Sequence, residues 1–430
     1  MRYQPIDHSL FKENRKNFTA QMQANALAVF NSNDLYPIGA DSTMPFQQDR
    51  NIYYLSGVDQ EESILVLFPD APKDKHKEIL FLKETNAHIA VWEGEKLTKD
   101  KAFETSGIKT VYWLKDFHKI FHELMSQADT VYVNTNEHYR ANHDTKTRED
   151  RFNVWLKENY PAHQVAKSNP ILQALRSVKH QLELDTMQQA CNITEKAFRR
   201  ILKYTKPGVW EYEIEAEFIH EFIRSRSKGF AYTPIVASGL NATVLHYIEN
   251  KAQCQDGQLI LLDVGAEYAN YSSDMTRTIP VNGRFTDRQK QIYKAVNKVK
   301  NEATKLLVPG AYWEEFHVEV GKMMTSELLD LKLLDKADVQ NEDPEWPAYK
   351  KYFMHGTSHH IGLDTHDYGL LHEPIQANQV FTVEPGIYIP EEKIGIRLED
   401  DVVVQDQGEP FNLMRNIPIE IEEIEDLMNS

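Results

Sequence analysis

The feature of this chain that most constrains its fold is a series of potential metal ligands set in apolar sequence in its C-terminal part. An ionised carboxylate in an apolar run is costly unless a positive charge meets it, and no cluster of Lys or Arg accompanies these acids. Metal ions would supply that charge, and four carboxylates are more than one divalent ion needs. We therefore predict that strands converge here on two metal ions. The ligands, in chain order, are Asp263, Asp274, His359, Glu384 and Glu399.

Each acid taken alone has a simpler explanation. Asp263 ends an apolar run and could be a turn residue, while Asp274 could face solvent beside Arg277. Glu384 could lie in an exposed turn, and Glu399 on a solvated strand face. Together, these explanations require four unrelated accidents that each place an acid against an apolar run. A shared metal site explains all four at once.

Two segments that carry these acids resemble each other. In LILLDVGAEY (259–268) and VFTVEPGIY (380–388), an apolar run is followed by an acid, a glycine and a tyrosine, and a second acid-bearing strand comes later. In the second case that strand is IGIRLEDDVVV, where strand alternation puts Arg397, Glu399 and Asp401 on one face. Two similar hairpins that each supply two carboxylates indicate a duplicated half-domain.

The segment MHGTSHHIGLDTHD contains four of the chain's histidines, too many for ordinary packing, although spacing alone does not identify the ligand among them. Carboxylates with one imidazole suit Mn²⁺ or another first-row ion such as Co²⁺, whereas structural zinc prefers Cys and His. We therefore expect Mn²⁺, with Co²⁺ or Zn²⁺ as alternatives. The candidate histidines are His355, His359, His360 and His366, together with His246 in VLHYIEN.

Composition excludes several classes of partner. The 430 residues carry a formal net charge of −17, which disfavours nucleic acid and anionic membranes. Only two cysteines are present, Cys191 and Cys254, so no disulfide framework is expected. The N-terminal stretch is polar, and no apolar run approaches the length of a membrane span. We expect a soluble, cytoplasmic protein.

The length predicts two domains, 1–172 and 173–430, with the boundary just after the turn signal at Asn169–Pro170. Alternating strands and helices predict an α/β layer in the first. In the second, residues 173–227 read as helices broken at Lys206–Gly208, and 286–307 as a helix that begins with a Thr286–Gln289 capping box. The acidic stretch 335–347 reads as an exposed loop. Predicted strands in the first domain are Ala26–Phe30, Ile64–Phe68, Glu78–Leu82 and Thr130–Val133.

At these residues the chain resembles the pita-bread metallopeptidases, and most closely the aminopeptidase P branch. The stretch MPFQQDRNIYYLSGVDQEESILVLF (44–68) resembles their creatinase-like N-terminal domain, so the resemblance covers essentially the whole chain. It implies an α/β N-terminal domain and an α+β pita-bread domain with pseudo-two-fold duplicated halves. The motifs that match, in the family's order, are LLDVGAEY, YSSDMTRT, HGTSHHIGLDTHD, TVEPGIY and IRLEDD.

The resemblance also implies a role for each ligand. Asp263 would bind one metal in bidentate fashion, Asp274 and Glu399 would bridge both, and His359 and Glu384 would complete the second. A hydroxide bridging the two ions would be the nucleophile. Glu384 would be the general base as well as a ligand.

Further residues would act on the substrate, a peptide with proline in its second position whose N-terminal residue is released. His366 would stabilise the oxyanion, His246 and His355 would line the pocket, and Arg397 and Tyr232 would orient metal-bound groups and substrate. Trp92 resembles a tryptophan that a neighbouring subunit contributes in tetrameric relatives, so a homo-oligomer, dimer or tetramer, is expected; a core or surface tryptophan is the alternative.

Three other functions compete with this one. A prolidase shares fold and metals but cuts only X-Pro dipeptides. A metal-free amidinohydrolase of the creatinase type, or a non-catalytic module that binds protein partners, would lack the five ligands that this chain retains. His360 and Thr365 depart from the family pattern, which affects the expected shape of the pocket rather than the ligand set.

Overall fold

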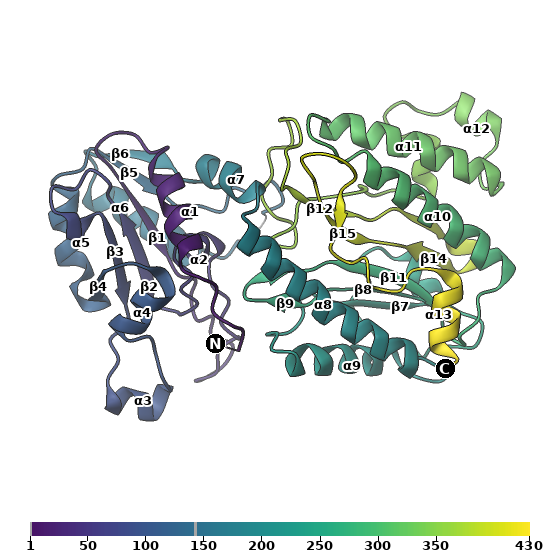
Figure 1. Cartoon of the computed structure of the whole chain (residues 1–430), viewed down its shortest axis with the longest axis horizontal. Helices are drawn as coiled ribbons and strands as arrows, with labels where there is room; N and C mark the ends of the chain where they lie inside the picture. The colour runs from purple at the N-terminus through teal and green to yellow at the C-terminus, as the bar shows by residue number, and fades with distance from the viewer. Residues whose placement is uncertain (1, 142–143) are drawn as a thin grey trace. The chain divides into compact units, whose positions relative to one another are not determined.

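The computed structural model describes residues 2–141 and 144–430, and these form two compact units, Tyr3–Arg176 and Ser177–Ser430 (Figure 1). The boundary expected after residue 172 falls inside helix α7 (Asn169–Ser177), which begins at the predicted turn signal. Among the helices of the described residues, none combines the length and the apolar composition needed to cross a membrane.

A six-stranded mixed sheet forms the centre of the first unit, in the order β4-β3-β2-β1-β5-β6. The strands β1, β2 and β3 pair in antiparallel fashion, while β4, β5 and β6 each join the sheet in parallel. The four strands predicted from sequence are all present, with ends that shift by one residue at most. The bounds are β1 Ala26–Asn31, β2 Ser63–Leu67, β3 Glu78–Leu82, β4 Thr110–Trp113, β5 Thr130–Val133 and β6 Gln164–Lys167.

Helices cover both faces of this sheet, as an α/β layer requires. Leu27, Val29 and Val131 turn one face toward α5 (Phe117–Met125) and α6 (Arg148–Asn159), where they share one apolar core with Phe121 and Leu156. On the other face, the ring of Phe18 packs edge-on against Phe30, 5.5 Å between centroids. The remaining helices of the unit are α1 Ser9–Thr19 and α2 Arg50–Ser56 on that second face, then α3 Ala87–Glu93 and α4 Lys99–Ser106.

In the second unit, two helix pairs enclose a set of short sheets (Figure 1). The first pair is α8 (Gln181–Tyr204) with α9 (Glu211–Arg224), and the second is α10 (Asp287–Lys305) with α11 (Trp313–Asp330). Thr286 and Gln289 form the predicted capping box at the start of α10. A final helix, α13 (Ile421–Met428), packs against α8.

The strands between the helices form two hairpins of the same design, which we call the first ligand hairpin (259–280) and the second ligand hairpin (380–403). In each, an outer strand pair is followed by an inner pair nearer the turn, and regular pairing is interrupted between the two pairs. The strands are β8 Leu259–Val264, β9 Glu267–Tyr268, β10 Tyr271–Ser272 and β11 Met275–Pro280 in the first, and β12 Val380–Val383, β13 Gly386–Ile389, β14 Ile394–Arg397 and β15 Asp400–Val403 in the second; β7 Ile235–Ser238 flanks β8, and β16 Phe411–Asn412 flanks β15.

Two details differ from the sequence prediction. The expected single strand through 394–403 is interrupted at Leu398–Glu399, because Leu398 N–H bonds to Pro385 and Glu399 N–H bonds to the carbonyl of Thr276 in the first ligand hairpin. The expected loop 335–347 contains a short helix, α12 (Lys336–Gln340), because Asp335 caps the N–H of Asp338 in a capping box. The sequence prediction rested on the acidic composition of this segment, which does not reveal the helix cap at Asp335.

Candidate metal centre

The first ligand hairpin brings Asp263 and Asp274 together through a close backbone approach at Gly265. A Cβ at Gly265 would lie 1.7 Å from the carbonyl oxygen of Ser273, so only glycine fits there. Asp263 is the fifth residue of β8, and Asp274 immediately precedes β11. The hydroxyl of Tyr232 lies 2.7 Å from Asp263 Oδ1 and 2.5 Å from Asp274 Oδ1. One hydroxyl hydrogen cannot satisfy both carboxylates, so positive charge is still needed between them.

The second ligand hairpin contributes Glu384 and Glu399 at its two interruptions. Glu384 follows β12, and its N–H bonds to the carbonyl of Thr357 at 2.7 Å. The N–H of Glu399 bonds to the carbonyl of Thr276 at 3.0 Å, and its Oε2 accepts the Thr276 hydroxyl at 2.6 Å. The break in the expected strand therefore attaches Glu399 to the first ligand hairpin, beside Asp274.

Among the clustered histidines, the structure places His359 against these acids. Its Nε2 lies 3.5 Å from Asp274 Oδ2 and 3.8 Å from Glu384 Oε1. Its Nδ1 donates to the carbonyl of His360 at 3.0 Å, which fixes the tautomer and turns the lone pair of Nε2 toward the carboxylates. One ligand atom each from Asp274, His359 and Glu399 lies within 4.8 Å of the others.

The acids of this cluster are short of positive charge. Burial, followed by the charge of Asp263, raises the pKa of Asp274 well above its ordinary range. Burial, followed by Asp274, does the same to the pKa of Glu399, and burial first of all raises the pKa of Glu384 to about 7. Within residues 2–141 and 144–430, Arg397 is the only Lys or Arg paired with any of the four acids, through Nη2 and Asp263 Oδ2 at 2.5 Å.

One arginine against two buried and two half-buried carboxylates leaves an excess of negative charge that a divalent cation would neutralise. The donors are carboxylate oxygens and a single imidazole nitrogen, the set that first-row divalent ions accept. The residues present therefore fit a divalent metal site. We call the five-residue set Asp263, Asp274, His359, Glu384 and Glu399 the metal centre.

Of the other predicted site residues, His355 and Arg397 lie beside this centre and share a partner. His355 Nδ1 donates to the carbonyl of Gly356 at 2.8 Å, so its Nε2 accepts from the hydroxyl of Tyr388 at 2.7 Å. Arg397 Nη1 donates to the same Tyr388 oxygen at 2.9 Å. Burial, followed by the charge of Arg397, lowers the pKa of His355 to about 3, and this keeps the ring neutral.

His366 and His246 are both exposed. The ring of His366 meets that of His359 edge-on, with centroids 4.1 Å apart. His246 is close enough to His355 for its charge to add to the depression of that pKa, after burial and Arg397. The hydroxyl of Tyr232 contacts both Asp263 and Asp274. These three aromatic side chains, like His355, therefore lie around the metal centre or its neighbours.

The remaining residues singled out from the sequence are not part of this cluster. Trp92 lies on α3 of the first unit and is 80 % exposed, and its contribution to a site stays a prediction. His360 is buried against the ring of Phe381, 4.3 Å between centroids, and faces Trp313. Thr365 approaches the hydroxyl of Ser272 at 3.5 Å. His360 is thus a core residue rather than a competing ligand.

Three residues that hold the ligands were not identified from sequence. Thr276 donates to Glu399 and contacts Arg397 Nε at 3.2 Å, and Tyr388 links His355 with Arg397. Asp401 Oδ2 accepts the N–H of Asp274 at 3.1 Å. The repeated tyrosine of the two hairpins was the available signal for Tyr388. Thr276 and Asp401 act across the hairpins, which a linear pattern does not reveal.

The comparison with known proteins agrees with this geometry. The profile of metallopeptidase family M24 matches residues 185–406, and that of the aminopeptidase P N-terminal domain matches residues 11–132. The chain is 34% identical to the Xaa-Pro aminopeptidase of Haemophilus influenzae, with 97% of each chain covered. It is 33% identical to the Xaa-Pro aminopeptidase of Escherichia coli, with 98% of each covered.

A solved structure extends the similarity to the fold. Zinc-substituted E. coli aminopeptidase P in complex with product superimposes with a TM-score of 0.86 at 32% identity, and 99% of each chain is covered. The chain belongs to metallopeptidase family M24. It has the two-domain fold of aminopeptidase P, in which the second unit is the pita-bread domain, so the predicted fold class is confirmed.

Proposed function

We propose that this protein is a metal-dependent Xaa-Pro aminopeptidase, which releases the N-terminal residue from peptides with proline in the second position. The observation that carries the proposal is the convergence of Asp274, His359 and Glu399 within 4.8 Å, with Glu384 beside them. Relatives named Xaa-Pro aminopeptidase match this chain over nearly its full length, which supports the same reaction here.

The five residues of the metal centre would hold two divalent ions, and Asp274 and Glu399 would be ligands to both. The oxygen-rich donor set favours Mn²⁺; Co²⁺ and Zn²⁺ are alternatives, and the zinc-substituted relative supports the latter. Bound divalent ions would supply the electrophilic charge and the activated water for hydrolysis of the peptide bond.

The side chains around the ions would handle protons and substrate. Glu384, which lies beside His359 in the metal centre, would accept a proton from water and pass it to the leaving nitrogen. His366, exposed beside His359, is placed to donate to the oxygen of the scissile carbonyl. The neutral ring of His355, fixed by Tyr388 and Gly356, would give the substrate a rigid wall.

Arg397 would orient Asp263, because it donates to that carboxylate while Tyr388 and Thr276 hold the rest of its guanidinium. Tyr232, through its hydroxyl, would orient Asp263 and Asp274. His246 would line the substrate pocket near His355. These are positioning roles, which adjust the ligands and the substrate without entering the reaction.

Assembly and location complete the proposal. The exposed Trp92 on α3 would reach the active site of another copy, which implies a homo-oligomer. Both cysteines are free and buried, which fits a reducing compartment, and we place the protein in the cytoplasm. The two units would remain those expected from sequence, an N-terminal domain and a catalytic domain.

The substrate test compares an X-Pro dipeptide with an X-Pro-Pro tripeptide, using protein reconstituted with Mn²⁺. We expect the tripeptide to be cleaved at its first bond and chelation to abolish turnover. Cleavage confined to the dipeptide would identify a prolidase instead. Absence of bound metal and of any turnover after reconstitution would eliminate the metallopeptidase function.

A further inference from the structure

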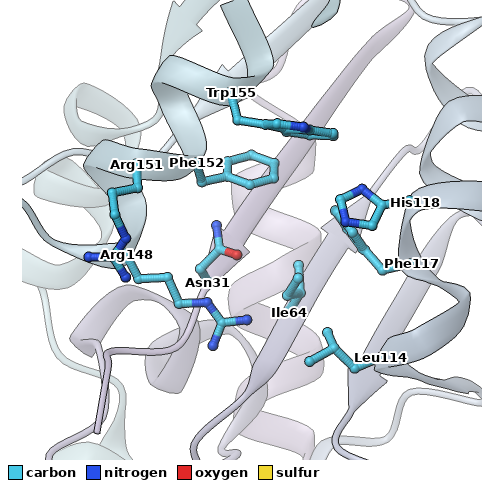
Figure 2. Close-up of a pocket in the computed structure, with 9 residues that line it drawn as sticks. All are labelled: Asn31, Ile64, Leu114, Phe117, His118, Arg148, Arg151, Phe152 and Trp155. Atoms are coloured by element: carbon cyan, nitrogen blue, oxygen red, sulfur yellow. The ribbon is translucent and has the colours of Figure 1, made fainter. Parts of the chain in front are cut away.

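The first unit contains a second candidate binding site, a pocket of about 320 Å³ between its sheet and the helices α5 and α6 (Figure 2). All of its lining residues belong to the first unit. The volume is at the lower end of the range for small-molecule sites, enough for one large amino-acid residue. The pocket has an aromatic side and a polar side, and the two sides together define a ligand.

The aromatic side is a wall of rings. Trp155 lies 5.4 Å from Phe152 and 5.1 Å from His118, between ring centroids, and Phe152 lies 6.1 Å from Phe117 (Figure 2). Ile64 adds an aliphatic surface at the end of the sheet. Such a surface favours a flat apolar group, which gains both burial and ring contacts.

The polar side is dominated by Arg148, the first residue of α6. Its Nη1 donates to the hydroxyl of Ser32 at 2.9 Å, and within the described parts of the chain no carboxylate pairs with this half-buried guanidinium. A guanidinium has five N–H donors, so most of them are open to a ligand. Burial lowers the pKa of Arg148, and the charges of Asp34, Glu149 and Glu62, none of which is paired with it, offset this only in part.

The nearby carboxylates are bonded to other groups. The carboxylate of Glu149 accepts from Asn31 N at 2.6 Å, from Asn31 Nδ2 at 2.8 Å and from Asn134 Nδ2 at 3.1 Å. Burial first of all raises the pKa of Glu149 to about 8, and these three donors, rather than Arg148, occupy its oxygens. Arg151, also at the pocket, is instead paired with Asp34 at 2.7 Å.

Asn31 adds a second directed group. The residue is 1% exposed, and its N–H and Nδ2 are used by Glu149. Its Oδ1 faces the pocket (Figure 2), and among the described residues no donor bonds to it. This carbonyl oxygen is therefore available to a donor on a ligand. The pocket thus presents a cation for an anionic group, an acceptor for an N–H, and rings for an apolar group.

We propose that this pocket binds the C-terminal residue of a peptide whose last side chain is aromatic. The terminal carboxylate meets Arg148, the last amide N–H meets Asn31 Oδ1, and the side chain lies on Phe152 and Trp155. A free aryl acid shares the carboxylate and the ring but lacks the N–H. This site is additional to the proposed peptidase reaction and does not depend on it.

Calorimetric titration of the full-length protein with N-acetyl-Gly-Phe tests the proposal, because the blocked N-terminus makes this probe unsuitable as an aminopeptidase substrate. We expect saturable binding, in metal-free and Mn²⁺-loaded protein alike. We expect binding weaker by roughly tenfold or more for the C-terminal amide, which lacks the charge, and for N-acetyl-Gly-Gly, which lacks the ring.

Arg148→Gln should weaken binding of N-acetyl-Gly-Phe by roughly tenfold or more, whereas the matched variant Arg151→Gln should change it by less than about twofold. Arg148→Lys should retain part of the affinity, and Trp155→Leu should lose affinity independently of charge. Thermal unfolding of each variant verifies its fold. Absence of binding, equal binding of the amide, or equal affinity in a folded Arg148→Gln variant would overturn the proposal.

Two further probes test whether the ligand is a peptide C-terminus, a free aryl acid or simply an anion. 3-Phenylpropionate should bind less tightly than N-acetyl-Gly-Phe, because it offers no N–H to Asn31. Equal or tighter binding of 3-phenylpropionate would overturn the assignment to a peptide end and indicate a free aryl acid. Inorganic phosphate that binds as tightly as N-acetyl-Gly-Phe would overturn the role of the aromatic wall.

Discussion

Two adjacent acids of the second ligand hairpin, Glu399 and Asp400, are almost equally buried, 1% and 2% exposed, but lie in opposite electrostatic surroundings. Burial alone would raise the pKa of Asp400, but the charges of Arg277 and Lys300, which both donate to it, lower that pKa below its usual range. Glu399 has a threonine hydroxyl and other carboxylates as neighbours, and its pKa is raised.

The comparison teaches that burial of an acid does not by itself indicate a metal. We call Asp400, Arg277 and Lys300 the Asp400 ion-pair cluster. There the protein supplies the positive charge from its own side chains, and the site is complete. At the metal centre, Arg397 is the only such charge among the described residues, so the cation must come from outside. The two regions should therefore respond in opposite ways to loss of an acid.

The largest difference is expected in turnover. Glu384→Gln should lower kcat by about 10²–10⁴-fold or more, because it removes the proton carrier, while the thermal unfolding temperature stays close to that of the parent protein. Steady-state kinetics on an X-Pro-Pro tripeptide, with circular dichroism for the fold, measures both. The exposed Glu391→Gln is the control and should keep normal kcat. Substantial kcat in Glu384→Gln would show that the base has been assigned wrongly.

The next effect is smaller and concerns the free energy of unfolding, which loss of an acid should lower in the Asp400 ion-pair cluster. Asp400→Asn should lower the free energy of unfolding of the metal-free protein by about 3–5 kcal/mol, because it leaves Arg277 and Lys300 buried without their partner. Chemical denaturation gives this value, and exposed Asp406→Asn should change it by less than about 0.5 kcal/mol. If Asp400→Asn proved as harmless as Glu384→Gln, the contrast between the two regions would fail.

The smallest effect is a difference in pH dependence, measured on chelator-treated protein. Glu384 has its pKa raised in the folded state, mainly by burial, from 4.5 to about 7, so its contribution to stability should be lost as pH rises between these values. Asp400 has its pKa lowered, so its contribution should be present above pH 3.8, its ordinary value, and lost as pH falls below it. For Glu384 the total change in the free energy of unfolding should amount to about 3 kcal/mol.

The single variants separate the contributions of Glu384 and Asp400 to the pH dependence of stability. Glu384→Gln should reduce the loss of stability between about pH 4.5 and 7, to which Asp274 and Glu399 also contribute because burial raises their pKa values. Asp400→Asn should flatten the loss at acidic pH. Unfolding temperatures recorded across pH in both variants check the assignment. A parent protein whose stability rises from pH 4.5 to 7 after chelation would mean that positive charge inside the centre already balances Glu384.

The ligands could be predicted from sequence because each lies in a short motif beside an apolar run. Their electrostatic partners could not, because these are set by contacts across the hairpins. Arg277 was considered as a partner for its near neighbour Asp274, but it instead pairs with Asp400, 123 residues away. Alternation placed Arg397, Glu399 and Asp401 on one face, and in the structure all three contact the first ligand hairpin, but alternation did not predict these contacts or the break at Leu398–Glu399.

The pocket of the first unit was not predicted for the same reason. Asn31, Phe117 and Arg148 are far apart in the sequence, and none lies in a recognisable motif. Strand prediction succeeded there because apolar runs are local signals. The direction of the Arg148 side chain, at the start of α6, depends on how the helices and the sheet of the first unit pack together. No local sequence pattern records that packing.

The bonds between the two ligand hairpins have a consequence for how the chain acquires its metal. Thr276 and Glu399 are 123 residues apart, and Asp263 and Arg397 are 134 apart, so neither half of the domain contains a complete centre. Contacts at such separation form late in folding. Metal uptake must follow the docking of the halves, and a newly made chain passes through an interval in which like charges face each other without a counter-ion. The supply of metal at that moment should set the yield of native protein.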